Sequence, residues 1–571
     1  MALKLEFPIR LNLTPRAFGR GSDSRPGLKV ASKLRVHSRV SQISVQLIRP
    51  PGSHLFGTLP VSIESDESVL VHLGYKQEFK RAFSRYELFG LAFTVNGVRV
   101  QGIASILVYS IPYGGPVSMV WGFLTGCVFI MCIALSIADM GSSAPTSGAL
   151  YYWTFKYSPP SCRKYLAWLV GYVNTIGYIA AVAAGGYACA LTILTTVTLG
   201  TDGAYVATSG HIYGTFCALL ISHAILASLA TKVLARTQPL YVLLNTGVFF
   251  AFIIALPIAT PSEYKNTAKH ALGHFENVSD YSDGFAFILS LLAPCWTVCG
   301  LDSSIHTSEE AWNAPTAVPF AILSSVVVEC VLGLAVVIRL AFNMGTDLVA
   351  LLSSPIEQPM AAILANSLGT DGTIASWVFV AILLYTSVMD ILIASSRQVF
   401  AFSRDGALPL SFLFYNINPY TGTPVNAVCM CVFIAGLLGL LSFAGSAAIG
   451  AIFTMSVFCP YLCYSTPIIA RFFGGQSFTP GPFSLGRASG PVAFVATTFM
   501  ILMMVVFLFP ASPAPVAESM NYTVVVVGGI VTLATAYYFV SGRFWFTGPV
   551  VTVADGSGKK RSEEKLGIKS V

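Results

Sequence analysis

Asp302 is the residue whose type and position most clearly indicate a functional role. It lies in a long apolar stretch at 284–308, two residues after Gly300. If that stretch crosses a bilayer, a carboxylate there costs about 2.5–3.5 kcal/mol on insertion scales, so it should face a cavity or a partner. Asp302 is therefore expected to bind a substrate ammonium or a coupling proton. A structural carboxylate bonded to helix N–H groups is the alternative.

Two further acids, Asp390 and Glu329, also stand in apolar stretches. Asp390 is expected to pair with a cation or to relay protons, and a solvated position near the inner membrane surface is the alternative. Glu329 could act as a gate, although a satisfied core acid is favoured. Together with Asp302 they are the candidates for proton coupling, whereas His306 is expected to be packed and fully bonded.

Two of the apolar stretches are interrupted near their middle by glycine, proline or polar residues. The first stretch is interrupted at 94–105, and the sixth carries Pro294 ahead of Gly300. Proline lacks the amide hydrogen that an interior helical residue donates. A break inside a bilayer is tolerated only where it lines a protein cavity. Interrupted helices at matching positions of two inverted repeats are typical of secondary transporters, whose substrates bind the bared main-chain groups.

The composition indicates that most of this chain is embedded in a membrane. It has 571 residues, of which 54% are hydrophobic and 10% are charged. Soluble domains carry about 25% charged residues. The twelve cysteines lie mostly inside apolar runs, without the spacing of secreted disulfides or zinc sites, so neither a metal nor a cofactor is expected.

The apolar runs predict an all-α polytopic membrane protein with about twelve transmembrane helices, because a spanning helix needs about 20 mostly apolar residues. The expected spans are 87–111, 115–138, 165–198, 212–231, 239–260, 284–308, 316–343, 373–396, 424–443, 446–470, 490–511 and 521–541. Lysine and arginine, among them Arg397 and Arg404, concentrate in alternate predicted loops, which places the N-terminus in the cytosol. The loop after Glu309 and Glu310 is predicted to be cytosolic although it is acidic.

The chain divides into three predicted parts. Residues 1–73 form a basic extension that is expected to be disordered, with an organellar transit peptide as the alternative. Residues 74–545 form the transmembrane domain, and residues 546–571 form a cytosolic tail.

Several stretches resemble the fungal amino acid and choline permeases. They are Ala144–Gly148 followed by Tyr151–Trp153, then Ala293–Trp296, Gly300–Ser303, His306–Ala311, Ala394–Arg397, Phe400–Pro409 and Pro482–Gly486. The likeness runs from about Gly74 to about Pro549. It points to the amino acid/choline branch of the amino acid–polyamine–organocation superfamily, which includes the GABA permeases.

The resemblance implies a 5+5 inverted repeat with broken helices 1 and 6 and two extra helices. It implies uptake of GABA, other amino acids, choline or related amines, often as a proton symporter. The plasma membrane is expected, an organellar membrane is the alternative, and no nucleic-acid partner is expected. The implied substrate-binding residues are Asn96, Gly97, Gly102, Ala104, Ser105, Trp296, Thr297, Cys299, Gly300 and Asp302.

The sequence departs from the family pattern at two places. Where family members carry an apolar stretch with a proline, this chain has Val98-Arg99-Val100-Gln101. Arg99 could bind a carboxylate, pair with Asp302, block the site, or come from retained intron sequence. Asp390 stands where the family has an uncharged residue.

Two other classes of function are alternatives to transport. A non-transporting membrane nutrient sensor or a channel could share the fold. An intramembrane enzyme would need clustered histidines or paired acids, but the eight histidines are scattered, so no enzyme is expected. Direct drive by ATP is not expected, because no G-x-x-x-x-G-K-[ST] loop occurs.

Overall fold

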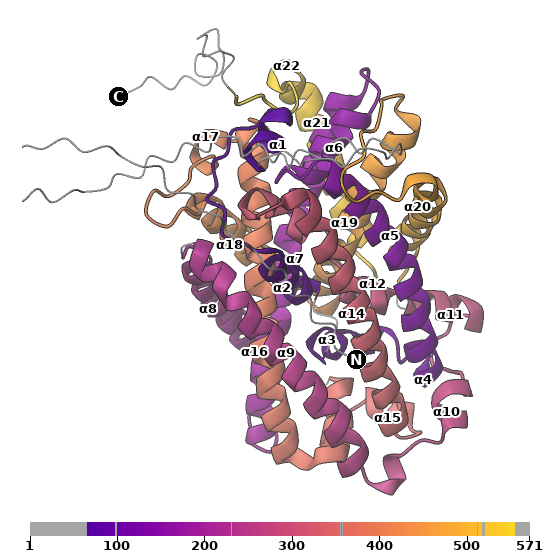
Figure 1. Ribbon diagram of the computed structural model, residues 1–571. Coiled ribbons are helices and arrows are strands. Elements are labelled where there is room, and N and C mark those ends of the chain that lie inside the picture. Colours follow the sequence, from indigo (N-terminus) through magenta and orange to yellow (C-terminus); the bar gives the residue numbers. More distant parts are fainter. Residues whose placement is uncertain are drawn as a thin grey trace, which may run out of the picture. The chain divides into compact units, whose positions relative to one another are not determined.

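The computed structural model describes residues 66–96, 100–229, 231–354, 356, 358–510, 512–516 and 520–553. Within these ranges, ten helices are long and apolar enough to cross a membrane (Figure 1). The principal helical segments are α5 (Phe123–Ser143), α7 (Arg163–Gly200), α8 (Ser209–Ala227), α9 (Thr231–Ala259), α14 (Ala314–Asn343), α16 (Pro359–Arg404), α18 (Val425–Gly439), α19 (Ser446–Phe473), α20 (Ser489–Val506) and α21 (Thr523–Tyr537).

The two stretches predicted to be interrupted are built from shorter helices. The first consists of α2 (Arg85–Asn96) and α3 (Val100–Ile106), and residues 97–99 between them lie outside the described residues. The sixth consists of α11 (Asp283–Ser290), α12 (Leu292–Thr297) and α13 (Ser303–His306). With the ten longer helices they make the twelve predicted segments, so the all-α polytopic fold is confirmed.

One helix begins much earlier than its apolar pattern predicts. Helix α16 begins at Pro359 rather than near 373. Its first part is kinked at Gly369, where φ is 70° and ψ is −179°. Polar residues around this kink hide the helical periodicity on which the prediction rested.

Helix α7 lies at the centre of the bundle and packs along both α16 and α19. Glycines allow these close approaches. A Cβ at Gly171 would lie 2.2 Å from the ring of Phe402, and one at Gly177 would lie 2.7 Å from the Cβ of Cys459. Small residues at helix contacts are the usual way in which membrane helices pack.

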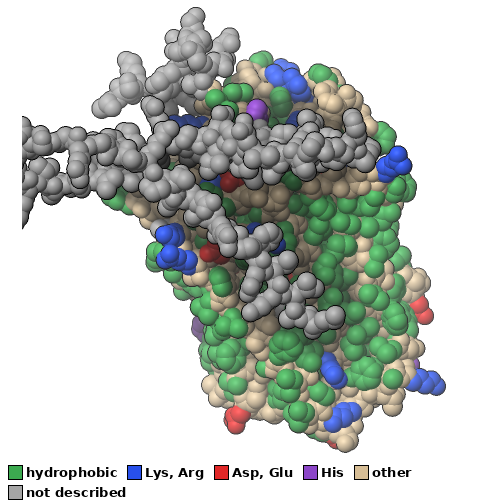
Figure 2. Space-filling view, viewed as in Figure 1, with side chains coloured by type: hydrophobic (Ala, Val, Ile, Leu, Met, Phe, Trp, Pro, Cys, Tyr) green, Lys and Arg blue, Asp and Glu red, His purple; other side chains and the backbone are tan. Residues whose placement is uncertain are grey.

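The lipid-facing character of the outer helices is visible in their side chains. Large apolar residues such as Leu243, Phe433, Phe494 and Val525 are exposed. Figure 2 shows hydrophobic side chains covering the middle of one face. Exposed apolar surface of this extent suits a hydrocarbon environment rather than water.

Short elements cap the two ends of the bundle. At one end lie α1 (Asp66–His72), α6 (Ala149–Tyr157), α17 (Ser411–Phe414) and α22 (Arg543–Trp545) (Figure 1). At the other end lie α10 (Ala268–Gly273) and α15 (Leu348–Leu352), and α4 (Gly115–Val117) lies next to the antiparallel pair β1 (Tyr113–Gly114) and β2 (Glu276–Asn277). The remaining one-turn elements are Leu107–Tyr109, Ser118–Gly122, Ser262–Tyr264, Ser308–Glu310, Leu440–Ala444, Gly486–Ala488 and Tyr538–Gly542.

The end that carries α1, α6 and α22 is the one that the distribution of basic residues assigns to the cytosol, and we call it the inner end. Helix α1 corrects one expectation, because residues 66–72 of the extension predicted to be disordered are helical. The remaining residues 1–65 of that extension, and residues 554–571 of the predicted tail, lie outside the described residues.

Candidate functional site

The sixth span is interrupted where the sequence predicts. Helix α12 ends at Thr297 and α13 begins at Ser303. Between them Gly300 has φ of 73°, a left-handed conformation that side-chain-bearing residues adopt only at a cost. Helix ends leave main-chain N–H and C=O groups without partners inside the helix. The break therefore brings main-chain polar groups into the interior of the bundle.

Asp302 lies at this break and is completely buried. Its Oδ1 accepts hydrogen bonds from the hydroxyl of Tyr178 on α7 at 2.7 Å and from that of Tyr464 on α19 at 2.6 Å. Its Oδ2 lies 3.0 Å from Nε2 of His306. The structural alternative expected bonds from helix N–H groups, but side chains of three different helices hold this carboxylate instead.

One proton must lie between Asp302 and His306. The Nδ1 of His306 lies 2.8 Å from the carbonyl oxygen of Ser147, which can only accept, so Nδ1 carries a hydrogen. The Nε2 lies 3.0 Å from Oδ2 of Asp302 and 3.2 Å from the amide nitrogen of Asn174. The Nε2···Oδ2 contact needs a hydrogen, held either by an imidazolium or by a carboxylic acid. His306 is thus fully bonded, as predicted, and it belongs to a pair that holds a proton.

Buried polar atoms without partners surround the same break. The indole Nε1 of Trp296 and the hydroxyls of Ser303 and Ser304 have no hydrogen-bond partner among the described residues. Such groups are rare in folded proteins, and here they are available to donate to a bound molecule. A carboxylate offers about four acceptor positions, and the three bonds to Asp302 leave one open. Donors for an anion and an acceptor for a cation therefore lie in one region.

The first span is interrupted over a shorter stretch than the predicted 94–105. Helix α3 begins at Val100, so Gly102, Ala104 and Ser105 are helical. Asn96 is the last residue of α2, and Gly97 and Arg99 lie outside the described residues.

A buried hydrogen bond connects the first turn of α3 to α9. The side-chain amide of Gln101 donates to Oδ1 of Asn245 on α9 at 3.1 Å, and both side chains are fully buried. A satisfied polar side chain can lie inside the bundle without breaking the helix. Two residues of the stretch that departs from the family pattern, Val100 and Gln101, are thus ordinary parts of α3.

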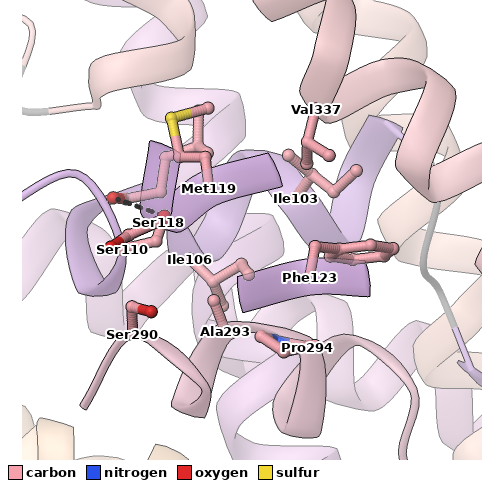
Figure 3. A pocket seen from close by; sticks show the side chains of 11 residues that line it. Ile103, Ile106, Ser110, Ser118, Met119, Phe123, Ser290, Ala293, Pro294 and Val337 are labelled. Atoms are coloured by element: carbon pink, nitrogen blue, oxygen red, sulfur yellow. Dashed lines mark hydrogen bonds between the residues drawn. The ribbon is translucent and has the colours of Figure 1, made fainter. Parts of the chain in front are cut away.

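The two interrupted spans line a small cavity together with Phe123 of α5 and Val337 of α14. Figure 3 shows Ile106 of α3 next to Ala293 of α12, and Ile103 of α3 next to Val337 of α14. The cavity between them measures about 10 Å³. That is room for about one water molecule. The structure is therefore closed at this point, and a substrate would need the two spans to separate.

The two other candidate acids are buried. Asp390 is fully buried, so the alternative of a solvated position is wrong. It accepts a hydrogen bond of 2.7 Å from the side-chain nitrogen of Gln238 on α9. Glu329 is also buried, on α14. Cys299 is half-buried within the break of the sixth span.

Buried ion pairs at the inner end explain the acidic loop after the sixth span. Glu309 binds Arg404 through contacts of 2.9 and 3.0 Å, and Glu310 binds Arg397 at 2.6 Å. The two arginines were counted as loop charges, but they lie in the last turns of α16 and are buried. The acids neutralise them. Burial acts to raise the pKa of Glu309, but the guanidinium of Arg404 holds that pKa below its ordinary value.

Asp405 joins the two ends of the described chain at the inner end. Its Oδ2 accepts from the hydroxyls of Tyr75 at 3.1 Å and Tyr151 at 2.7 Å, and its Oδ1 accepts from the main-chain N–H of Val550 at 3.0 Å. The main-chain N–H of Thr552 also donates to the carbonyl of Gly74. Burial raises the pKa of Asp405 to about 6.

This pKa predicts that the stability of the protein depends on pH. Between the ordinary value of 3.8 and about 6, the folded protein binds more protons at Asp405 than the unfolded chain does. Its stability should therefore fall as pH rises through this interval. We expect the Tm of Asp405→Asn, measured in detergent, to rise relative to the Tm of the wild type as the pH is raised from 3.8 to about 6. Glu263→Gln, at an exposed residue, is the control, and a constant difference in Tm would contradict the prediction.

Several functional candidates escaped the sequence analysis. Tyr178 and Tyr464 were not singled out, because tyrosines in membrane helices usually just pack. Gln238 and Asn245 lie seven residues apart on α9, which places them on one helical face. That spacing of two amides in an apolar helix was the signal that could have identified them.

Comparisons with known proteins agree along most of the chain. A family model described as amino acid permease matches residues 85–531. An uncharacterised amino-acid permease of Schizosaccharomyces pombe is 35% identical, with 86% of this chain and 88% of the relative covered. The GABA-specific permease of Saccharomyces cerevisiae is 35% identical, with 86% and 87% covered. Amino-acid permease BAT1 of Arabidopsis thaliana is 31% identical, with 86% and 97% covered.

Proposed function

Because the chain belongs to the amino acid permease family, we propose that it carries a small amino acid of the GABA type by alternating access, with a proton as co-substrate. The protein is an integral, multi-pass membrane protein. We propose the plasma membrane as its location. The proposal has two parts, the chemistry of the cargo and the source of the driving force, which separate experiments can test.

The observation that carries the proposal is the buried polar cluster at the break of the sixth span. Asp302 keeps one open acceptor position for an ammonium group. The hydroxyls of Ser303 and Ser304 and the indole nitrogen of Trp296 are donors without partners among the described residues. In a transporter with interrupted helices, the substrate binds at such a point near the bilayer midplane.

This chemistry favours an amino acid over choline. An amino acid has an ammonium group that can donate to Asp302 and a carboxylate that can accept from the unpartnered donors. Choline has no carboxylate, and its quaternary nitrogen has no hydrogen to donate. The name of the yeast relative, a GABA-specific permease, supports GABA as the first substrate to test.

Uptake by purified protein in liposomes tests the proposal. We expect labelled GABA to enter in a saturable manner and to accumulate when the outer medium is more acidic than the lumen. Butylamine lacks the carboxylate and butyrate lacks the ammonium, so each should compete more weakly than unlabelled GABA, as should choline. Absence of uptake for GABA and for a panel of amino acids would overturn the proposal. Binding without uptake would indicate a sensor.

A further inference from the structure

We infer that Asp390 and Gln238 form a proton-binding site in which a protonated carboxyl is shared with the glutamine amide. The site lies between α16 and α9, beside α2. It deepens the proposed function by naming the group that takes the coupling proton, and it rests on that function for its role in transport.

The first evidence is the state of the two side chains. Both are fully buried. The Nε2 of Gln238 donates to Oδ1 of Asp390 at 2.7 Å. The remaining oxygens, Oδ2 of Asp390 and Oε1 of Gln238, have no hydrogen-bond partner among the described residues. Two buried acceptors on one bonded pair lack a donor.

A single proton on Asp390 would satisfy both oxygens. A carboxylic acid has one O–H donor, and the amide oxygen of Gln238 is an acceptor. The acid and the amide would then form a ring of two hydrogen bonds, with Nε2–H donating to Oδ1 and Oδ2–H donating to Oε1. A carboxylate in the same place would be a buried charge with one neutral donor, which is costly.

The surroundings of Asp390 offer no charge to compensate an ionised carboxylate. Within the described part of the chain, no lysine, arginine or histidine forms an ion pair with it; of the histidines on helices that pack against α16, His223 on α8 contacts the carbonyl of Tyr385 and His306 on α13 contacts Asp302. Arg397 lies about two turns after Asp390 on α16 and forms an ion pair with Glu310. Tyr241 on α9 is the ionisable side chain that interacts with Asp390, and Tyr385 on α16 interacts with Tyr241. Asp302, in contrast, accepts three hydrogen bonds, one of them from His306.

The position of the pair connects it to the first interrupted span. A Cβ at Gly90 of α2 would lie 2.9 Å from the Cβ of Gln238, so α2 covers the pair at close range. Helix α2 ends at Asn96, next to the expected substrate site. A movement of α2 that opens this site would admit water to the pair. The O–H bond of Asp390 then breaks, the proton passes to water, and the carboxylate that remains is solvated.

Asp390→Asn tests the inference without disturbing the packing. The asparagine amide can donate to Oε1 of Gln238 and accept from its Nε2, so the variant keeps both hydrogen bonds but cannot release a proton. We expect D390N still to bind GABA, which a gain in Tm on addition of GABA would measure. Its accumulation of GABA under an acidic outer medium should be lower than that of the wild type by about tenfold or more, because one coupled ion is lost. Asp371→Asn, an exposed acid on the same helix, is the matched control and should accumulate GABA like the wild type.

Infrared spectroscopy gives a second measurement that does not need transport. The spectrum of the wild type minus that of D390N should contain the carbonyl band of one protonated carboxylic acid, because other buried carboxyls such as Asp405 contribute equally to both. Gln238→Met, which removes the amide, should shift that band. GABA accumulation by D390N at the wild-type level, or a wild-type minus D390N difference spectrum without a carboxylic acid band, would overturn the inference. If the wild type neither binds nor moves GABA, the proposed function fails, but the infrared band still decides whether Asp390 holds the proton.

Discussion

Asp302→Asn is expected to fold normally and to lose GABA uptake by roughly 100-fold, the equivalent of about 3 kcal/mol. The asparagine oxygen can accept from Tyr178 and Tyr464, and its NH2 can donate to Nε2 of a neutral His306. All of the hydrogen bonds to the side chain are thereby kept. The change removes the negative charge, the proton shared with His306 and the charge-assisted bond to a substrate ammonium.

Uptake in liposomes and the Tm in detergent together measure this effect. Asp302→Ala leaves the buried hydroxyls of Tyr178 and Tyr464 without an acceptor, at about 1–3 kcal/mol each, so it should destabilise the protein where D302N does not. Tyr464→Phe removes one donor to Oδ1 and leaves the charge in place, so it is the matched control and should reduce uptake much less. Wild-type uptake by D302N would show that the carboxylate is structural.

The positions of the helices followed from the sequence because apolar run length is set by the thickness of the bilayer. The kinked start of α16 escaped, since residues around Gly369 are polar and break the periodicity. The interruption of the sixth span was also predictable, because Pro294 and Gly300 each disfavour a regular helix locally.

The partners within the site were less predictable, because they come from helices far apart in the chain. Tyr178 and Tyr464 lie 124 and 162 residues from Asp302. No local pattern marks such pairs. The same reason explains why Arg404 was interpreted as a loop charge, since its partner Glu309 is 95 residues away and belongs to another helix. The distribution of lysine and arginine predicts which loops face the cytosol, but it does not show which charged side chains form ion pairs inside the bundle.

The ion pair between Arg404 and Glu309 yields the prediction with the largest effect on stability. Both side chains have no exposed surface. The guanidinium also stacks on the ring of Tyr75 at 3.8 Å, so it connects the segment before α2 to the end of α16. Arg404→Met would leave the carboxylate of Glu309 buried without its cation. Removal of one partner from a buried pair costs about 3–5 kcal/mol.

We therefore expect Arg404→Met to lower the Tm sharply and to reduce the amount of protein that reaches the membrane, whereas Arg487→Met, at an exposed arginine, should change neither. A double variant distinguishes the energy of the ion pair itself from the cost of burying a single unpaired charge. Arg404→Met combined with Glu309→Gln removes both charges, so it should regain much of the stability that the single change loses. If instead the double variant is as unstable as the sum of the two single variants, the pair contributes no coupling energy. The inner end would then be held by its hydrogen bonds and packing, such as those of Asp405 with Tyr75, Tyr151 and Val550, rather than by buried charge.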